Sequence, residues 1–185
     1  MNAGVCRLAA TLVLIVPPVL ASEPARLAPE SAPSTADVAP AGEPGQRLEV
    51  KGAVLAADGR TPIARASVYV YQTDARGHYR PDDAMGNRNP RLKALLRTDA
   101  AGHYSFRTIR PASYPGTRVP QHIHYEVAVA GHPSRIFEIV FDEDPLVTDE
   151  IRRHAAQPGS IYSIRRTEPG PGGVGQVSQD VVLGR

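Results

Sequence analysis

The stretch HIHYEVAV at residues 122–129 alternates polar and apolar side chains over most of its length. Successive side chains of a β-strand point to opposite faces, so His122 and His124 share one face. The other face carries Ile123, Tyr125, Val127 and Val129. The stretch therefore predicts a strand that gives one face to a hydrophobic core and carries two imidazoles on the other.

Six further stretches show a similar alternation on both sides of this strand. They are Leu48–Leu55, Ala66–Tyr71, Tyr104–Phe106, Ile136–Phe141, Ile161–Ile164 and Val177–Leu183. Turn-forming residues separate them, and Asp58-Gly59 is a strong short-loop signal. Seven short strands divided by turns are typical of a sandwich or barrel. We therefore predict an all-β fold, a two-sheet β-sandwich of short strands with long loops.

Helices have little room in this pattern. Leu92–Leu96 and Asp144–Ala155 are the stretches that allow one. In the second stretch Thr148 is a suitable N-cap, and Asp149 and Glu150 place negative charge in the first turn, where the helix dipole favours it. The sequence therefore predicts one or two short helices at most.

Composition and charge limit the class of protein. The 185 residues allow one domain with a sizeable core. The 21 basic and 19 acidic residues leave a net charge of +2 and no basic stripe, which argues against a nucleic-acid binder held by phosphate contacts. The single cysteine excludes a disulfide framework and any multi-cysteine zinc or iron–sulfur site. The 18 Pro and 16 Gly argue against a helical bundle.

The first 45 residues differ in character from the rest. Leu8–Val16 is an apolar run too short to span a membrane, and Val19-Leu20-Ala21 resembles a signal-peptidase site. Residues 22–45 are rich in Pro, Ala and Glu and show no apolar period. We therefore expect a cleaved signal peptide at 1–21, a disordered linker at 22–45 and one domain at 46–185. Such a protein would be periplasmic or secreted, without stable membrane insertion.

A short segment occurs twice in the chain. TDARGHY at 73–79 and TDAAGHY at 98–104 both place an Asp and a Gly where a hairpin bends. Two copies do not make a solenoid. The repeat predicts two similar turns and leaves the roles of Tyr79 and Tyr104 open.

The paired histidines are the clearest candidates for chemistry. Two imidazoles on one non-core face, with Glu126 next on that face, suit a metal that takes nitrogen ligands. Taken alone, the pair is equally compatible with a surface feature that has no function, or with the start of a cupin-like divalent-metal site. A cupin-like site needs a further histidine on a later strand, and His132 and His154 are both poorly placed for it.

A non-catalytic β-sandwich that binds carbohydrate or protein is another alternative. Gly52–Tyr71 resembles many extracellular sandwich modules. Such modules do not require tyrosines together with an HxH pair, so the residues around the histidines distinguish the two classes.

Four motifs stand in a specific order around the histidine pair. A G-x-Y at 77–79 is followed by TDxxGxYxFxTIxP from Thr98 to Pro111, then by Tyr114-Pro115 and then by the HIH strand. This order resembles the intradiol ring-cleavage dioxygenases, the protocatechuate 3,4-dioxygenase and catechol 1,2-dioxygenase family. FDEDP at 141–145 resembles the segment that follows in those enzymes. The resemblance extends from about Val50 to Leu146.

The resemblance implies an Fe(III) site with two tyrosinate and two histidine ligands. The tyrosinates fall on Tyr79 and Tyr114 and the histidines on His122 and His124, while a structural tyrosine of the family falls on Tyr104. Fe(III) prefers hard anionic oxygen, which suits two phenolates. The implied reaction is non-haem, Fe(III)-dependent cleavage of a catecholic aromatic by O2 to a cis,cis-muconate, without an external reductant. The implied mobile ligand, displaced by catechol, is Tyr114.

Departures from the family pattern bear on the substrate. The family arginine before the first histidine falls on Val119, with Arg118 one position away, and the family glutamine after the HIH strand falls on Glu138. The loop from Tyr114 to His122 is short. Tyr114, Arg118 and Glu138 are the catalytic candidates. A short loop would leave the entrance of the substrate pocket wide, and Glu138 would add negative charge near it. We therefore expect a neutral or bulky catechol to be preferred over protocatechuate. The sequence leaves open whether the domain forms a homo-oligomer.

Overall fold

The computed structural model describes residues 25–81, 87 and 89–184. Its elements in chain order are β1 Thr35–Asp37, β2 Arg47–Leu55, β3 Ser67–Gln72, β4 Leu92–Arg97, β5 His103–Ile109, β6 His122–Ala128, β7 Arg135–Phe141, α1 Asp149–Ala155, β8 Tyr162–Arg165, β9 Glu168–Pro169, a 3-10 turn at Pro171–Gly173, β10 Gly175–Ser178 and β11 Val181–Val182. Strands dominate the described chain, as the alternation predicts.

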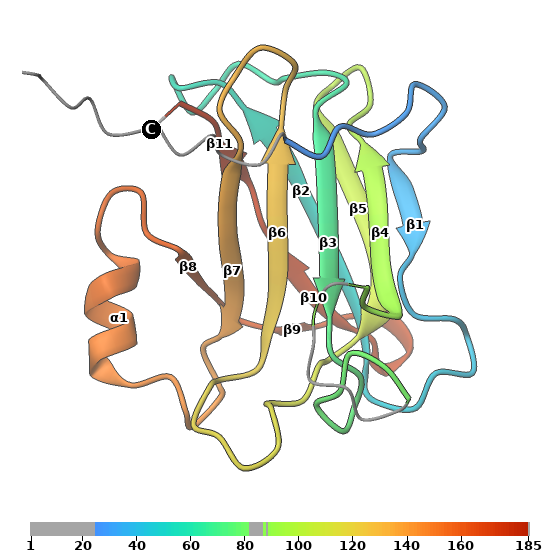
Figure 1. Cartoon of the computed structure of the whole chain (residues 1–185), viewed down its shortest axis with the longest axis vertical. Helices are drawn as coiled ribbons and strands as arrows, with labels where there is room; N and C mark the ends of the chain where they lie inside the picture. Colours follow the sequence, from blue (N-terminus) through green and yellow to red (C-terminus); the bar gives the residue numbers. More distant parts are fainter. Residues whose placement is uncertain (1–24, 82–86, 88, 185) are drawn as a thin grey trace, which may run out of the picture.

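Two sheets pack face to face (Figure 1). One has the strand order β1-β5-β2-β10-β9, with β11 also paired to β2, and the other has the order β4-β3-β6-β7-β8. The inner faces supply one hydrophobic core. Phe106 of β5 and Tyr125 of β6 meet across it, with ring centroids 6.1 Å apart. The predicted two-sheet β-sandwich is confirmed.

Strand β6 has the two faces that the sequence predicts. Ile123 and Tyr125 are each 1% exposed and Val127 is fully buried, all within the core. The imidazoles of His122 and His124 lie on the opposite, outer face of the sheet. Because β6 pairs with β3 on one side and β7 on the other, that face is flanked by neighbouring strands.

One of the two stretches that allowed a helix is a strand. Leu92–Leu96 belongs to β4, which pairs antiparallel with β3 along its whole length. The partner strand, which the local sequence does not reveal, decides this conformation. The other stretch contains α1, and Thr148 caps it as predicted, because its hydroxyl accepts a hydrogen bond from Ile151 N at 3.3 Å.

The C-terminal stretch, expected as one strand, contains two. Strands β10 and β11 both run parallel to β2, and Gln179 lies between them. The backbone at Gln179 approaches β2 so closely that a Cβ at Gly52 would lie 1.8 Å from Gln179 O. Tyr104 donates a hydrogen bond to the same carbonyl at 2.6 Å. This buried contact accounts for the structural role expected of Tyr104.

The expectation of a disordered linker at 22–45 is wrong for the part that the structure describes. Strand β1 runs parallel to β5, and Val38 and Ala39 are buried in the core. Backbone N–H groups of β4 and β5 donate to the carbonyls of Pro33 and Ser34, so the segment closes one edge of the sandwich. Backbone pairing to strands holds this segment, and composition alone gives no sign of such pairing.

The signal peptide expected at 1–21 lies outside the described residues. Among the helices that the structure describes, none is long and apolar enough to cross a membrane. The periplasmic or secreted location therefore stays a prediction.

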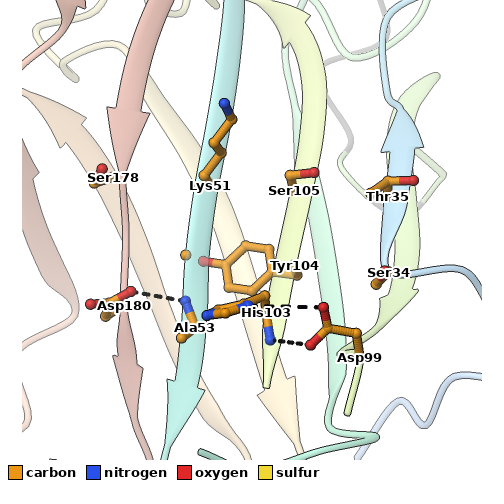
Figure 2. Close-up of a pocket in the computed structure, with 11 residues that line it drawn as sticks. Ser34, Thr35, Lys51, Ala53, Asp99, His103, Tyr104, Ser105, Ser178 and Asp180 are labelled. Carbon is orange, nitrogen blue, oxygen red and sulfur yellow. Dashed lines mark hydrogen bonds and ion pairs between the residues drawn. The ribbon is translucent and has the colours of Figure 1, made fainter. Parts of the chain in front are cut away.

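The outer face of the β2 sheet is polar (Figure 2). Thr35, Ser105, Lys51 and Ser178 lie side by side on neighbouring strands, in register. The predicted site residues lie on the outer face of the other sheet or on the loops beside it. The two outer faces therefore differ in chemistry.

Candidate metal centre

Four side chains bring their polar atoms together near the start of β6. Strand β6 begins at the lower end of the sandwich in Figure 1. Tyr79 Oη lies 2.6 Å from His124 Nε2, and Tyr114 Oη lies 2.9 Å from His122 Nε2. The two hydroxyl oxygens are 2.5 Å apart and the two Nε2 atoms are 3.1 Å apart. The structure thus places the two expected tyrosines and the two expected histidines around one point.

A contact at Nδ1, the ring nitrogen that faces away from the converging atoms, orients each imidazole. His122 Nδ1 donates to Pro120 O at 2.7 Å, and His124 Nδ1 lies 3.2 Å from a carboxylate oxygen of Glu138. Because each Nδ1–H is engaged, each Nε2 presents its lone pair to the centre. Glu138 lies opposite His124 in the β6–β7 register, so strand pairing supplies the orienting carboxylate.

The four converging atoms are too close together for the protons that they carry, because only the two phenol oxygens bear a proton. Each phenol carries one proton, and it is used in the hydrogen bond to one imidazole. No proton remains for the pair of hydroxyl oxygens or for the pair of Nε2 atoms, so lone pairs face each other across 2.5 and 3.1 Å. A cation at the centre would accept all four lone pairs. Two phenol oxygens and two imidazole nitrogens are a donor set that suits iron.

Burial determines the protonation of these groups. It raises the pKa of Tyr79, with a further contribution from the adjacent Tyr114 hydroxyl, and it raises the pKa of Tyr114. Burial, followed by the neighbouring His124, lowers the pKa of His122. Both phenols and His122 are therefore neutral near pH 7 in the metal-free protein, whereas a bound cation would stabilise the phenolates.

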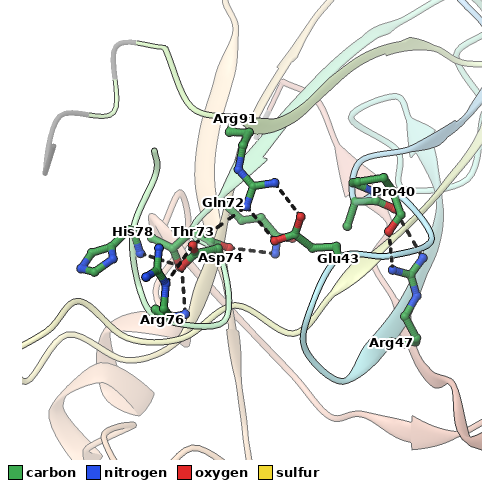
Figure 3. Close-up of polar contacts among 10 residues, drawn as sticks. Pro40, Glu43, Arg47, Gln72, Thr73, Asp74, Arg76, His78 and Arg91 are labelled. Carbon is green, nitrogen blue, oxygen red and sulfur yellow. Dashed lines mark hydrogen bonds and ion pairs between the residues drawn. The ribbon is translucent and has the colours of Figure 1, made fainter. Parts of the chain in front are cut away.

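A tight turn positions Tyr79 (Figure 3). Asp74 Oδ1 accepts hydrogen bonds from two backbone N–H groups of the turn, and Gly77 has a φ of +86°. A Cβ at Gly77 would lie 2.1 Å from Ser113 O, so glycine is needed for the turn to pack against this segment. Since Ser113 precedes Tyr114, the same contact brings the two tyrosines together.

Arg91 holds the turn from the other side. Its backbone N–H donates to Tyr79 O at 2.9 Å. Its guanidinium donates two hydrogen bonds to the Glu43 carboxylate, at 2.5 and 2.7 Å (Figure 3). These hydrogen bonds lower the pKa of Glu43 against the opposing effect of burial. Glu43 belongs to the segment expected to be a linker, so that segment supports Tyr79.

The other two catalytic candidates, Arg118 and Glu138, differ in their relation to the four converging side chains. Arg118 is exposed in the loop after Tyr114, and no hydrogen bond or ion pair joins its side chain to another residue of the described chain. Glu138 is paired with His124. Burial opposes ionisation of Glu138, but the hydrogen bond with His124 and the two neighbouring imidazoles lower its pKa overall. Glu138 is therefore a carboxylate that is held against His124 beside the site.

Acidic residues near the pair offer a second candidate ligand set. His122, His124 and Glu138 have ligand atoms within 4.8 Å of one another. However, Glu138 faces the Nδ1 of His124, on the far side of the ring from the tyrosines. Glu126 accepts a hydrogen bond from Arg26 N, away from the converging atoms. The tyrosine and histidine set therefore has the better geometry for one ion.

Tyr71 is a further neighbour of the site, and no local sequence signal predicts it. Its ring stacks on His124, with centroids 4.3 Å apart and an interplanar angle of 14°. Asn87 donates to its hydroxyl at 3.3 Å, and burial raises the pKa of Tyr71 to about 12. Tyr71 lies opposite His124 in the β3–β6 register. The alternation of Tyr69 and Tyr71 is visible in the sequence, but the strand that pairs with them is not.

Comparisons with known proteins place the chain among dioxygenases. A family model described as "Dioxygenase" matches residues 24–185. Catechol 1,2-dioxygenase 2 of Acinetobacter lwoffii is 32% identical over 143 residues, which cover 68% of this chain and 50% of that protein. The protocatechuate 3,4-dioxygenase beta chain of Burkholderia cepacia is 35% identical over 117 residues, covering 57% and 49%. The chain spans about half the length of these relatives.

Solved structures show the same fold. The dioxygenase domain of a dioxygenase–carbohydrate-binding fusion from Streptomyces sp. SirexAA-E matches with a TM-score of 0.62 at 22% identity, covering 85% of this chain and 92% of that one. Catechol 1,2-dioxygenase from Acinetobacter sp. ADP1 matches with a TM-score of 0.62 at 24% identity, covering 83% and 59%. At these identities the likeness concerns the fold alone.

Proposed function

The chain belongs to the intradiol dioxygenase family, and from that membership we propose that it cleaves the ring of a catecholic aromatic with O2 to give a cis,cis-muconate-type product. The observation that carries the proposal is the convergence of Tyr79, Tyr114, His122 and His124 on one point. These four side chains would hold one Fe(III) ion. Addition of both atoms of O2 to a catechol gives the muconic acid directly, so no external reductant is needed.

The metal and the protein contribute different parts of this chemistry. When bound, Fe(III) would supply the Lewis acidity that keeps two phenols ionised and activates a catechol towards O2. The protein holds the ligands in place from outside. Pro120 O and Glu138 fix the two imidazoles, and Tyr71 covers one face of the His124 ring. Such outer partners keep ligands in a single orientation.

The two tyrosines have different supports, which divides their roles. Tyr79 is fixed by the Gly77 turn and by the backbone of Arg91. Tyr114 is followed by an exposed loop at residues 115–119. We infer that Tyr114 is the ligand that moves when catechol arrives, and that its phenolate Oη accepts a proton from the incoming hydroxyl. Tyr79 stays in place.

The mouth of the site favours an uncharged catechol over one with a ring carboxylate. Val119 stands where the family has an arginine, and it is partly exposed. Arg118 points to no described partner, and Glu138 is engaged with His124. Without a fixed cation, protocatechuate would gain little from its carboxylate. We propose that catechol, or an alkyl- or aryl-extended catechol, has a kcat/KM about fivefold higher than protocatechuate, since one exposed charge is worth about 1 kcal/mol.

Oxygen consumption with product identification tests this function. Purified, iron-loaded protein should consume O2 and catechol in equimolar amounts and yield cis,cis-muconate. The Tyr79→Phe variant is the matched control and should be inactive. Protein that holds iron but consumes no O2 with catechol or its extended analogues would contradict the proposal. A semialdehyde product would contradict the intradiol position of cleavage.

A further inference from the structure

A cavity lies at the end of the sandwich opposite the candidate metal centre. Its volume is about 860 Å³. The connection between β2 and β3, the turn between β6 and β7 and the residues after β11 form its walls, near the top of Figure 1. Strand β6 extends from one site to the other, since His122 begins the strand and Val129, which lines the cavity, follows its last residue. The cavity is therefore separate from the tyrosine and histidine set.

Aliphatic side chains form most of the wall. They include Ile63, Val129, Pro133, Ile136 and Leu183. Ile136 is 66% exposed, so part of this apolar wall is open to solvent. A concave, mostly apolar wall of this size with a few polar groups is typical of small-molecule sites. The described lining residues include no Phe, Tyr or Trp, which favours an aliphatic ligand over a stacked aromatic one.

The polar groups of the cavity favour an anion. Arg135, His132 and Ser134 line it, and none of the described lining residues is acidic. The guanidinium of Arg135 lies 5.4 Å from the Phe137 ring centroid, and no hydrogen bond or ion pair joins it to another residue in the described part of the chain. A guanidinium presents a planar fork of donors that fits a carboxylate. An aliphatic wall next to this cation is complementary to a chain that ends in a carboxylate.

We propose that this cavity binds an aliphatic carboxylate, with its chain against the aliphatic wall and its carboxylate on Arg135. This ligand class differs from the catechol of the proposed reaction. Binding requires neither iron nor the four converging side chains. The proposed carboxylate site can therefore be tested independently of the ring-cleavage proposal.

Calorimetric titration with decanoate, below its micelle concentration, tests the site. Decanoate should bind saturably, decan-1-ol more weakly, and decyltrimethylammonium not at all. Arg135→Gln should weaken decanoate binding about tenfold, as expected for loss of a hydrogen bond to a charged group. Arg107→Gln, which removes an arginine from the outer face of β5, is the matched control and should bind decanoate like the wild type. Metal-free protein should give the same isotherm as iron-loaded protein.

A second variant tests the contribution of the aliphatic wall. Ile136→Glu adds a carboxylate to the cavity wall and should weaken decanoate binding at least as much as Arg135→Gln. The proposal is overturned if decanoate does not saturate, if decan-1-ol binds as tightly, or if Arg135→Gln has no effect. It is also overturned if iron removal abolishes decanoate binding, or if sedimentation shows a dimer that Ile136→Glu dissociates, because a second copy would then cover the cavity.

Discussion

The two copies of the repeated segment, TDARGHY at 73–79 and TDAAGHY at 98–104, form the same turn but place their tyrosines in opposite environments. In both copies the Asp accepts hydrogen bonds from its own turn, and the Gly has a positive φ, +86° in the first and +76° in the second. Tyr79 lies among the converging ligands (the first turn is drawn in Figure 3). Tyr104, which is labelled in Figure 2, is buried, and its hydroxyl donates to Gln179 O.

The difference comes from what packs against each turn. The Gly77 turn meets the backbone of Ser113, next to Tyr114, whereas the Gly102 turn meets Pro62 and Ile63 near the opposite end of the sandwich. Arg91 and Glu43 brace the first turn, while Asp99 and His103 of the second are exposed. Local sequence determines the turn, and the packing partner determines what the tyrosine does.

Exchange of each tyrosine for phenylalanine is the strongest test of this comparison. Tyr79→Phe should lower kcat/KM for catechol below about one thousandth of the wild-type value, because the fixed ligand is lost. Tyr104→Phe should keep the activity and lower the free energy of unfolding by about 1–2 kcal/mol, because Gln179 O loses its buried donor. Oxygen uptake and chemical denaturation measure the two effects. Equal loss of activity in both variants would break the comparison.

Tyr114→Phe separates the mobile tyrosine from the fixed one. We expect some iron and visible colour to remain, while kcat falls about a hundredfold because the proton acceptor is lost. His122→Ala and His124→Ala should instead lose most of the metal. Iron content and steady-state kinetics check these outcomes. Equal iron loss in all three variants would refute the division of roles.

Substitution of the two turn glycines tests whether the packing of the Gly77 turn positions the metal-binding tyrosines. Gly77→Ala and Gly102→Ala should each cost about 1–3 kcal/mol, because both positions have a positive φ. Gly77→Ala should also weaken iron binding about tenfold, because the alanine Cβ would displace the segment that carries Tyr114. Thermal denaturation and chelator competition measure these effects. Unchanged iron affinity in Gly77→Ala would show that the turn does not position the tyrosines.

The smallest expected effect concerns the Arg91–Glu43 ion pair, which supports the first turn and has no counterpart described at the second. Folding lowers the pKa of Glu43, so its pairing with Arg91 stabilises the protein above its ordinary pKa of 4.5, and this contribution is lost as the pH falls through the lower folded-state pKa. Glu43→Gln should reduce the free energy of unfolding by about 1 kcal/mol at pH 7 and by less in acid. Glu30→Gln, which removes an exposed partner of Arg65, is the control and should change little. A deficit of Glu43→Gln that does not shrink in acid would contradict the assignment.

The sequence predicts those parts of the molecule whose signal is local. The alternation around His122 predicts β6 and its two faces, and the Asp and Gly of each repeat predict the turns. Residues that are placed by strand pairing are harder to predict from the sequence. Glu138 and Tyr71 both flank His124 through the register of neighbouring strands, and neither contact follows from sequence spacing. The order of the segment before β2 does not follow from its composition for the same reason, because backbone pairing to β5 holds it.

The visible absorption spectrum during iron titration tests the central claim most directly, namely that Tyr79 binds the metal and Tyr104 does not. We predict a wine-red protein with a broad phenolate-to-iron charge-transfer band that saturates at one iron per chain. The band should be unchanged in Tyr104→Phe and strongly altered in Tyr79→Phe. A colourless protein that nevertheless binds iron, or a band that Tyr79→Phe leaves unchanged, would contradict the account.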